Sequence, residues 1–250
     1  MRSFTVMLLN DRGGECSIYA HLPLLASVAK ESYGDSVDIL ETVTGVRSEI
    51  FQKLDLPDCL EQTENILINP SKYGLYNDAF LGIYDKHIRV TDEVVYLQYA
   101  KELKSLVKKA KEYGYLFALS SKLCEVLSKK YALGVLTRAF YQAGEEAELK
   151  KLVKRYEVLP KKLENYHALM RKAWLKESMG FALEIQDLHL GGLAQRLRLQ
   201  GARLKTYLQT GEEIAELREE ILNATCSDYA DGEPVWDSEW CSIATVNRIN

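Results

Sequence analysis

The sequence predicts a mainly α-helical protein, and three observations lead to that prediction. Only 5 prolines and 15 glycines occur in 250 residues, so few residues break helices over long stretches. Apolar side chains recur with the period of a helix along most of the second half of the chain. One convincing strand is present, in the short apolar run at residues 3–9. A hydrophobic fraction of 47% excludes an intrinsically disordered chain.

The first 90 residues combine one strand–loop–helix unit with less regular chain. The apolar run is followed by a loop with two glycines and then by a segment with leucines on one helical face. Gly45 is a stop signal between two short helices. The expected order is strand, loop, helix, two short helices and an irregular connector, at residues 3–9, 10–14, 15–29, 36–44, 47–54 and 56–88.

Helical periodicity dominates from Thr91 onwards. Thr91 is a plausible N-cap, and acidic residues follow it in the first turn. Tyr96, Leu103 and Ala110 repeat every seven residues, which predicts one helix of about five turns that ends at Gly114. Further helices are expected at residues 116–131, 135–142 and 145–156, then from Pro160, over the leucines of residues 190–208, and after Gly211 with Ile214, Leu217 and Ile221 aligned. Short connections between them predict an antiparallel bundle.

The formal net charge of −4 conceals three regions of different sign. Residues 1–95 carry 15 acidic and 8 basic residues, residues 96–210 carry 11 and 22, and residues 211–250 carry 10 and 2. A basic middle is compatible with nucleic-acid binding. No recognised motif accompanies it, so the favoured interpretation is that the bases form solvated helix faces that meet the acidic ends.

Cysteine and histidine usage excludes several classes of site. The 5 cysteines are scattered without a CxxC pair, which indicates a reduced compartment rather than a disulfide framework. The 4 histidines show no metal-ligand spacing, so no metal and no cofactor are expected. No signal-peptide pattern and no apolar run of membrane-spanning length occur, so we expect a cytoplasmic protein without a membrane partner.

The best candidate for a site is the loop after the strand, because active sites of α/β folds lie at the carboxyl ends of strands. Asp11 and Glu15 are carboxylates that could accept hydrogen bonds from sugar hydroxyls. The alternative is that they cap the helix that begins there, and on the residues alone this is the favoured reading. Cys16 as a nucleophile would need a base, and His21 is poorly placed to be one.

Three later features have a structural and a functional interpretation. Residues 69–78 either pack over a site or form a boundary turn anchored by Tyr73 and Tyr76, and the turn is favoured. Asp85 and His87 are interpreted as surface residues. The paired glycines within residues 184–193 are interpreted as a place where helices approach closely.

Three segments in order resemble the C-terminal portion of family 20 glycoside hydrolases. They read LNDRGGECS at residues 9–17, NPSKYGLYNDAFLGIYD at residues 69–85, and GFALEIQDLHLGGLAQRL with RLKTYLQTGEEIAELREEIL within residues 180–222. The closest branch is the bacterial β-N-acetylhexosaminidases that carry an extra helical C-terminal domain. The resemblance implies a helical domain preceded by a short βα remnant of a (β/α)₈ barrel.

The family mechanism is substrate-assisted, with an Asp–Glu pair on an earlier barrel strand. The resemblance implies that this pair is absent here, so no catalytic residue is assigned, and Asp11 and Glu15 are not its equivalents. In the family a Trp-Gly-Asp run precedes the glycines; Asp11 stands at its Asp position and would bind substrate, with Glu15 beside it. Leu9 replaces the Trp, which removes a ring-stacking surface for the sugar.

The predicted organisation is a barrel remnant with connector at residues 1–90, a helical domain at residues 91–225 and an acidic irregular tail at residues 226–250. The predicted function is that of a C-terminal fragment of a β-N-acetylhexosaminidase, inactive alone, which meets an N-acetylhexosaminide only when the rest of the barrel is supplied. The alternative is a non-catalytic helical module that forms homo-oligomers. An unpaired strand also predicts a hydrophobic patch near residues 3–30.

Overall fold

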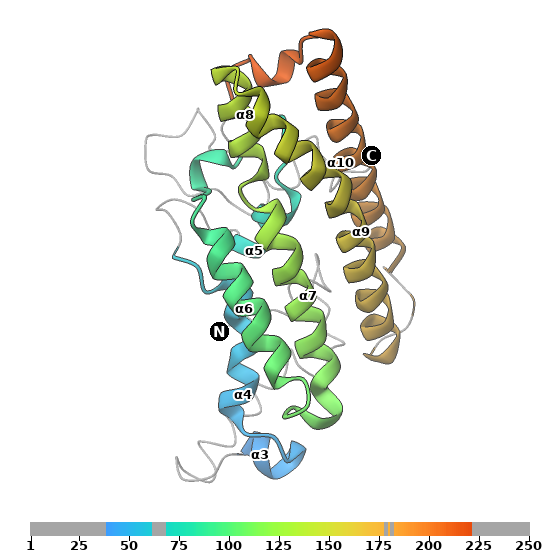
Figure 1. The fold of residues 1–250 in the computed structure, drawn as a ribbon. Coiled ribbons are helices and arrows are strands. Elements are labelled where there is room, and N and C mark those ends of the chain that lie inside the picture. The colour runs from blue at the N-terminus through green and yellow to red at the C-terminus, as the bar shows by residue number, and fades with distance from the viewer. Residues whose placement is uncertain (1–38, 62–68, 178–179, 181–182, 222–250) are drawn as a thin grey trace, which may run out of the picture.

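The computed structural model describes residues 39–61, 69–177, 180 and 183–221, shown as coloured ribbon in Figure 1. Within these ranges the chain forms α-helices and short 3₁₀ turns and no strand, which confirms the mainly α prediction. The predicted strand at residues 3–9, the helix at residues 15–29 and the hydrophobic patch lie outside the described residues. The domain boundaries at residues 90/91 and 225/226 remain predictions.

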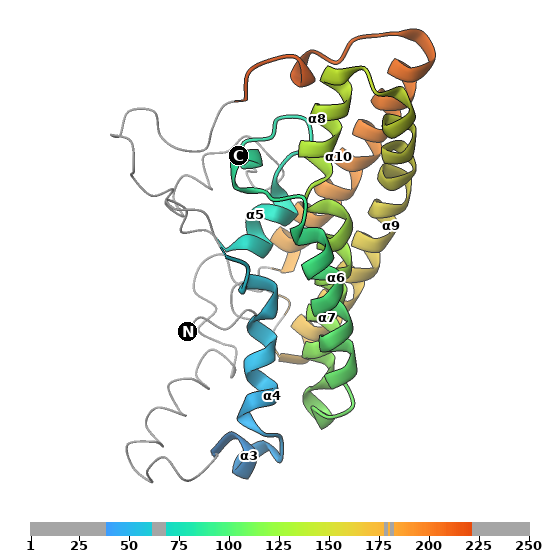
Figure 2. The same cartoon turned by 60° about the vertical axis from the view of Figure 1, so that its left-hand side comes forward.

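Eight α-helices are described. They are α3 Ile39–Thr44, α4 Ser48–Gln52, α5 Pro70–Tyr76, α6 Asp92–Leu106, α7 Gly114–Lys130, α8 Leu133–Ala143, α9 Glu146–Glu177 and α10 Leu183–Thr210. Helix α7 contacts α5, α6, α8 and α9, and α9 packs along α10. Figures 1 and 2 show the α9–α10 pair on the side of α7 away from α4. The bundle therefore has α7 at its centre, with the α9–α10 pair as one outer layer.

The two short helices and their separator follow the sequence prediction. Helix α3 ends at Thr44 and Gly45 takes a φ of +65°, the left-handed conformation that stops a helix. Helix α4 follows, and Phe51 on it packs against the rings of Tyr113 and Phe117. Gly45 was sufficient to predict this helix end, because the end depends on the backbone conformation of Gly45 itself.

The predicted irregular connector at residues 56–88 is more ordered than expected in its described parts, residues 56–61 and 69–88. It holds the 3₁₀ helix Lys53–Asp58 in part, and then α5, which starts with Pro70 in its first turn. Asp58 caps α5 from outside: its carboxylate accepts the Ser71 backbone N–H at 3.1 Å and the Asn69 side-chain amide at 2.9 Å. The capping residue lies eleven or more positions away, so the sequence pattern gave no helix signal.

Helix α6 is shorter than predicted. It ends at Leu106 rather than near Gly114, and a turn with a 3₁₀ helix at Lys111–Tyr113 leads into α7. Thr91 precedes α6, but its side chain makes no capping hydrogen bond. A Cβ atom at Gly114 would overlap the carbonyl of Val107, so this glycine permits the tight reversal between α6 and α7.

The predicted interruption before Pro160 is wrong. Helix α9 runs without a break from Glu146 to Glu177, with Pro160 inside it. Proline removes one backbone hydrogen bond, but the apolar face continues on both sides of it. Leu152, Tyr156, Leu163 and Tyr166 are all buried. Packing of this face against α7 and α10 outweighs the local cost.

The predicted last helix after Gly211 is also wrong. Gly211 ends α10 with a φ of +76°, as expected, but from there to residue 221, where the described chain ends, the one helical element is the 3₁₀ turn Ala215–Leu217. Side chains of α8 bind this segment instead: the Tyr141 hydroxyl accepts the Ile214 N–H at 2.8 Å, and Gln142 donates to the Leu217 carbonyl at 3.1 Å. These contacts satisfy backbone groups that a helix would otherwise pair.

Among the described residues, no helix combines the length and the apolar character needed to cross a bilayer.

Candidate functional site

The sequence-predicted site residues, Asp11 and Glu15, lie outside the described residues. Their assignment to sugar binding therefore stays a prediction. Within the described part of the chain, no group of three His, Cys, Asp or Glu residues is placed to hold a metal ion. The polar cluster that the structure does present surrounds Asp78, in the second of the three motif segments.

The Asp78 loop, residues 77–85, connects α5 to the segment before α6. Asp78 Oδ1 accepts the backbone N–H groups of Phe80 at 2.9 Å and Leu81 at 3.0 Å, so the carboxylate organises its own loop. The backbone N–H of Gly82 donates to the Asp78 carbonyl at 2.9 Å, and Gly82 has a φ of +65°. These bonds give the loop one compact shape.

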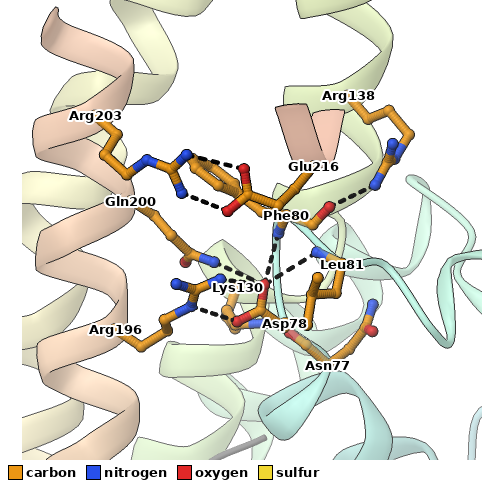
Figure 3. A network of polar contacts seen from close by, with 10 residues as sticks. All are labelled: Asn77, Asp78, Phe80, Leu81, Lys130, Arg138, Arg196, Gln200, Arg203 and Glu216. Carbon is orange, nitrogen blue, oxygen red and sulfur yellow. Dashed lines mark hydrogen bonds and ion pairs between the residues drawn. The ribbon is translucent and has the colours of Figure 1, made fainter. Parts of the chain in front are cut away.

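Helix α10 supplies two side chains to the Asp78 carboxylate (Figure 3). Arg196 donates from Nε to Oδ2 at 2.7 Å, and Gln200, one helical turn later, donates to Oδ1 at 2.9 Å. Burial disfavours the charged carboxylate, but the bonds and charge of Arg196 and the two backbone N–H groups outweigh burial. The pKa of Asp78 therefore lies below its usual value, and this carboxylate is ionised.

Lys130, the last residue of α7, holds the start of the loop from the other side. Its Nζ donates to the Asn77 carbonyl at 2.5 Å, and only 2% of the residue is exposed. Burial lowers the pKa of the Lys130 ammonium to about 8, although the nearby carboxylates of Asp78 and Asp85 act in the opposite direction. A buried lysine of this kind stays charged at neutral pH through its anionic neighbours.

Arg138 on α8 joins the loop to the segment beyond α10. One guanidinium nitrogen donates to the Phe80 carbonyl at 2.5 Å, and another donates to the Glu219 carbonyl at 3.1 Å. Arg203 on α10 forms a bidentate pair with Glu216, at 2.5 and 2.8 Å, beside the same loop (Figure 3). The pairing with Arg203 lowers the pKa of Glu216 to about 2.

Three ion pairs show how the charged regions of the sequence meet. Arg196 with Asp78 and Arg155 with Glu93 join the basic middle to the acidic N-terminal region, and Arg203 with Glu216 joins it to the acidic C-terminal region. The prediction that bases meet the acidic ends is confirmed at these pairs. The prediction that the bases are solvated is wrong for Lys130 and Arg138, which are buried.

The other polar residues of this motif also have structural partners. Tyr73 and Tyr76 are buried, which supports the anchoring interpretation, but they lie on a helix rather than in a turn. Asp85 accepts a hydrogen bond from the Asn77 amide at 2.7 Å. His87 is 6% exposed, and burial, then the charge of Lys86, lowers its pKa to about 4. The prediction that Asp85 and His87 are plain surface residues is therefore wrong.

The arrangement stabilises structure more readily than it performs chemistry. The Asp78 carboxylate is bound by two backbone N–H groups and two side chains, and the loop carbonyls are bound by Lys130 and Arg138. A general acid or base must reach a proton of the substrate. The oxygens of the Asp78 carboxylate instead accept hydrogen bonds from donors of their own chain.

Residues 49–235 match the family model described as the glycoside hydrolase 20C C-terminal domain. This match covers about three quarters of the chain. The chain belongs to this family. The matched range contains the second and third motif segments of the resemblance, and the first segment, with Asp11 and Glu15, precedes it. No curated protein matches the chain. The resemblance to family 20 glycoside hydrolases is thus confirmed for the C-terminal domain.

Sequence reasoning missed the partners of Asp78 in this glycoside hydrolase domain. Arg196 and Gln200 are separated by four residues on the side of α10 that includes buried leucines, which was the available signal. Lys130 and Arg138 gave no such signal, because each is one base among many on a basic stretch of chain. Only the fold shows that they point at a loop about fifty residues earlier in the sequence.

Proposed function

We propose that this chain is the C-terminal part of a β-N-acetylhexosaminidase, and that residues 39–221 have an architectural role in it. The observation that carries the proposal is the Asp78 cluster, whose charged groups pair with one another and with backbone atoms. Such a cluster fixes helices and loops in place. The family match supports a C-terminal domain of a family 20 glycoside hydrolase, and the β-N-acetylhexosaminidase activity is proposed from the resemblance.

Hydrolysis of a terminal N-acetylhexosamine in this class uses an Asp–Glu pair and the acetamido oxygen of the substrate. By the resemblance, that pair belongs to an earlier strand of the barrel, so the chain alone would not hydrolyse substrate. Asp11 and Glu15 would contact the sugar once the rest of the barrel is supplied. A cytoplasmic location belongs to the same proposal, and the free thiols of Cys59 and Cys124 agree with a reducing compartment.

An aryl β-N-acetylglucosaminide assay tests the proposal. The purified 250-residue chain is expected to release no more aryl alcohol than buffer does, and a preparation with Asp78→Asn is expected to behave identically. Sustained turnover by the chain alone, abolished by a substitution within residues 39–221, would place the chemistry in this domain and overturn the proposal.

A second candidate function is a helical module that assembles subunits. It is favoured by exposed large apolar side chains on α10, where Ile185, Leu188 and Leu199 are 43%, 56% and 49% exposed. The two functions are compatible, because an architectural domain can also carry a subunit interface.

A further inference from the structure

Helix α10 turns a second face away from the core. We name the α10 outer stripe as the five exposed residues Leu188, Gly191, Gln195, Leu199 and Ala202. Their spacings of three or four residues place them on one side of the helix. The opposite side, which includes Leu190, Leu193, Leu197 and Leu204, is buried against the bundle. The stripe is therefore a separate surface from the core-facing side of α10.

Gly191 has no packing explanation within the described residues. It lies well inside a 28-residue helix, where glycine is less favourable than alanine. A Cβ atom built at Gly191 has nothing within 4 Å. Gly201 on the same helix is different, because a Cβ there would lie 2.7 Å from the Tyr156 Cβ. Gly201 lets α9 approach, whereas Gly191 faces open space.

The stripe is symmetric about Gln195. Gly191 and Leu199 lie four residues before and after it, and Leu188 and Ala202 lie seven before and after it. If two such helices lie antiparallel with Gln195 at the crossing point, each Leu199 faces the partner's Gly191 and each Leu188 faces the partner's Ala202. Large side chains then meet small ones at each level on both sides of the Gln195 pair, as close helix packing requires.

Building on the subunit-assembly role proposed above, we propose that the α10 outer stripe binds a second copy of this chain, in an antiparallel two-fold dimer centred on Gln195. A two-fold interface must be complementary to itself, and the large–small order of this stripe meets that condition. The two Gln195 amides carry one donor group and one acceptor each, so they can bond to each other at the axis and fix the register.

The charges at the two ends of the stripe agree with the antiparallel direction. Glu184 is exposed in the first turn of α10, and Lys205 is exposed near its last turn. In the proposed register the Glu184 of each copy lies near the partner's Lys205, so opposite charges meet at both ends. In a parallel pair, Glu184 would instead face the partner's Glu184 and Lys205 the partner's Lys205, so like charges would meet.

Sedimentation velocity of the full chain tests the proposal. The wild type is expected to be a dimer, and Leu188→Lys and Leu199→Lys are each expected to raise the dissociation constant at least about tenfold. The matched control is Val94→Lys on α6, since Val94 is 61% exposed on another face and its substitution should leave the dimer unchanged. Circular dichroism checks that all variants keep the helical content of the wild type.

Two further variants test the register. Gly191→Leu places a large side chain where the partner's Leu199 would pack, so it should weaken the dimer at least about tenfold while the monomer remains folded. Glu184→Lys and Lys205→Glu should each weaken the dimer, and the double exchange should restore it. A wild type that stays monomeric, or a dimer that none of these substitutions weakens, would overturn the proposal.

Discussion

The clearest residue-scale feature is a buried lysine whose charge is set by its surroundings. Lys130 donates to the Asn77 carbonyl, and burial lowers its pKa to about 8, against an ordinary value of 10.5. Between these two values the unfolded chain binds a proton at Lys130 that the folded chain has released. Stability contributed by this group is therefore complete above pH 10.5 and is lost as the pH falls through about 8.

The first prediction concerns Lys130→Met. The unfolding free energy of the wild type minus that of this variant should increase between pH 8 and pH 10.5, by up to about 3 kcal/mol. Urea unfolding at a series of pH values measures this difference. Taking the difference cancels the contribution of other groups that titrate in both proteins. Lys129→Met, at the exposed neighbouring position, is the control and should show no such slope. A flat difference for Lys130→Met would contradict the assignment.

Sequence reasoning could identify Asp78 as part of a polar segment but not its charge state. Asp78 lies within a glycine-containing loop, which is a local feature of the sequence. Its ionisation depends on Arg196 and Gln200, which are 118 and 122 residues away in the sequence. Asp11 and Glu15 differ from Asp78, because the sequence motif alone proposes their role. They lie outside the described residues, so the structure shows no partners for them.

At the scale of elements, stops were predictable and continuations were not. Gly45 and Gly211 end helices through their own left-handed backbone conformation. Pro160 signals the start of a helix, but the continuous buried face of α9 overrides that signal. Ile214 belongs to a helical periodicity, but hydrogen bonds from α8 hold its segment in another conformation. Glycine stops were therefore predicted, whereas the lengths of α6 and α9, the existence of α5 and the absence of a helix after Gly211 were not.

The contact between α5 and α7 leads to the second prediction. A Cβ atom at Gly74 would overlap the ring of Tyr131, and this ring is held in place by a hydrogen bond from its hydroxyl to that of Tyr73 at 3.0 Å. Gly74→Ala should lower the unfolding free energy by about 2 kcal/mol. Thermal unfolding measures the change.

The matched control is Gly191→Ala, studied at a concentration where the wild type is monomeric. It adds the same methyl group in open space on a helix and should raise stability by about 1 kcal/mol. Equal effects of the two substitutions would show that α5 does not press against α7 at Gly74.

The third prediction tests the continuity of α9. Pro160→Ala restores the missing N–H donor in the helix interior, a gain of about 3 kcal/mol, and leaves a small gap in the core that offsets part of it. A net gain of about 1 kcal/mol in unfolding free energy is expected from urea denaturation. A clear loss of stability would indicate that Pro160 begins a separate helix, as the sequence alone suggests.

At the scale of the whole molecule, the Asp78 loop joins segments that are distant in the sequence. It receives hydrogen bonds from α7, α8 and α10, and Arg138 extends the connection to residue 219. The apolar core runs through the same elements, from Val46 on the N-terminal side to Leu217. We therefore expect the described helices to unfold as one cooperative unit.

We propose that the charged groups of this glycoside hydrolase domain maintain its architecture, with Asp78 as their centre. Equilibrium urea unfolding of Asp78→Asn, followed by circular dichroism and by tryptophan fluorescence, is the decisive experiment. The substitution leaves the shape of the side chain nearly unchanged, removes the charge that Arg196 pairs with, and should cost about 3 kcal/mol. Glu212→Gln, at an exposed position, is the control and should cost almost nothing. One coincident transition is expected for both probes, shifted to lower urea in Asp78→Asn. An unshifted transition, or a shift no larger than that of Glu212→Gln, would contradict it.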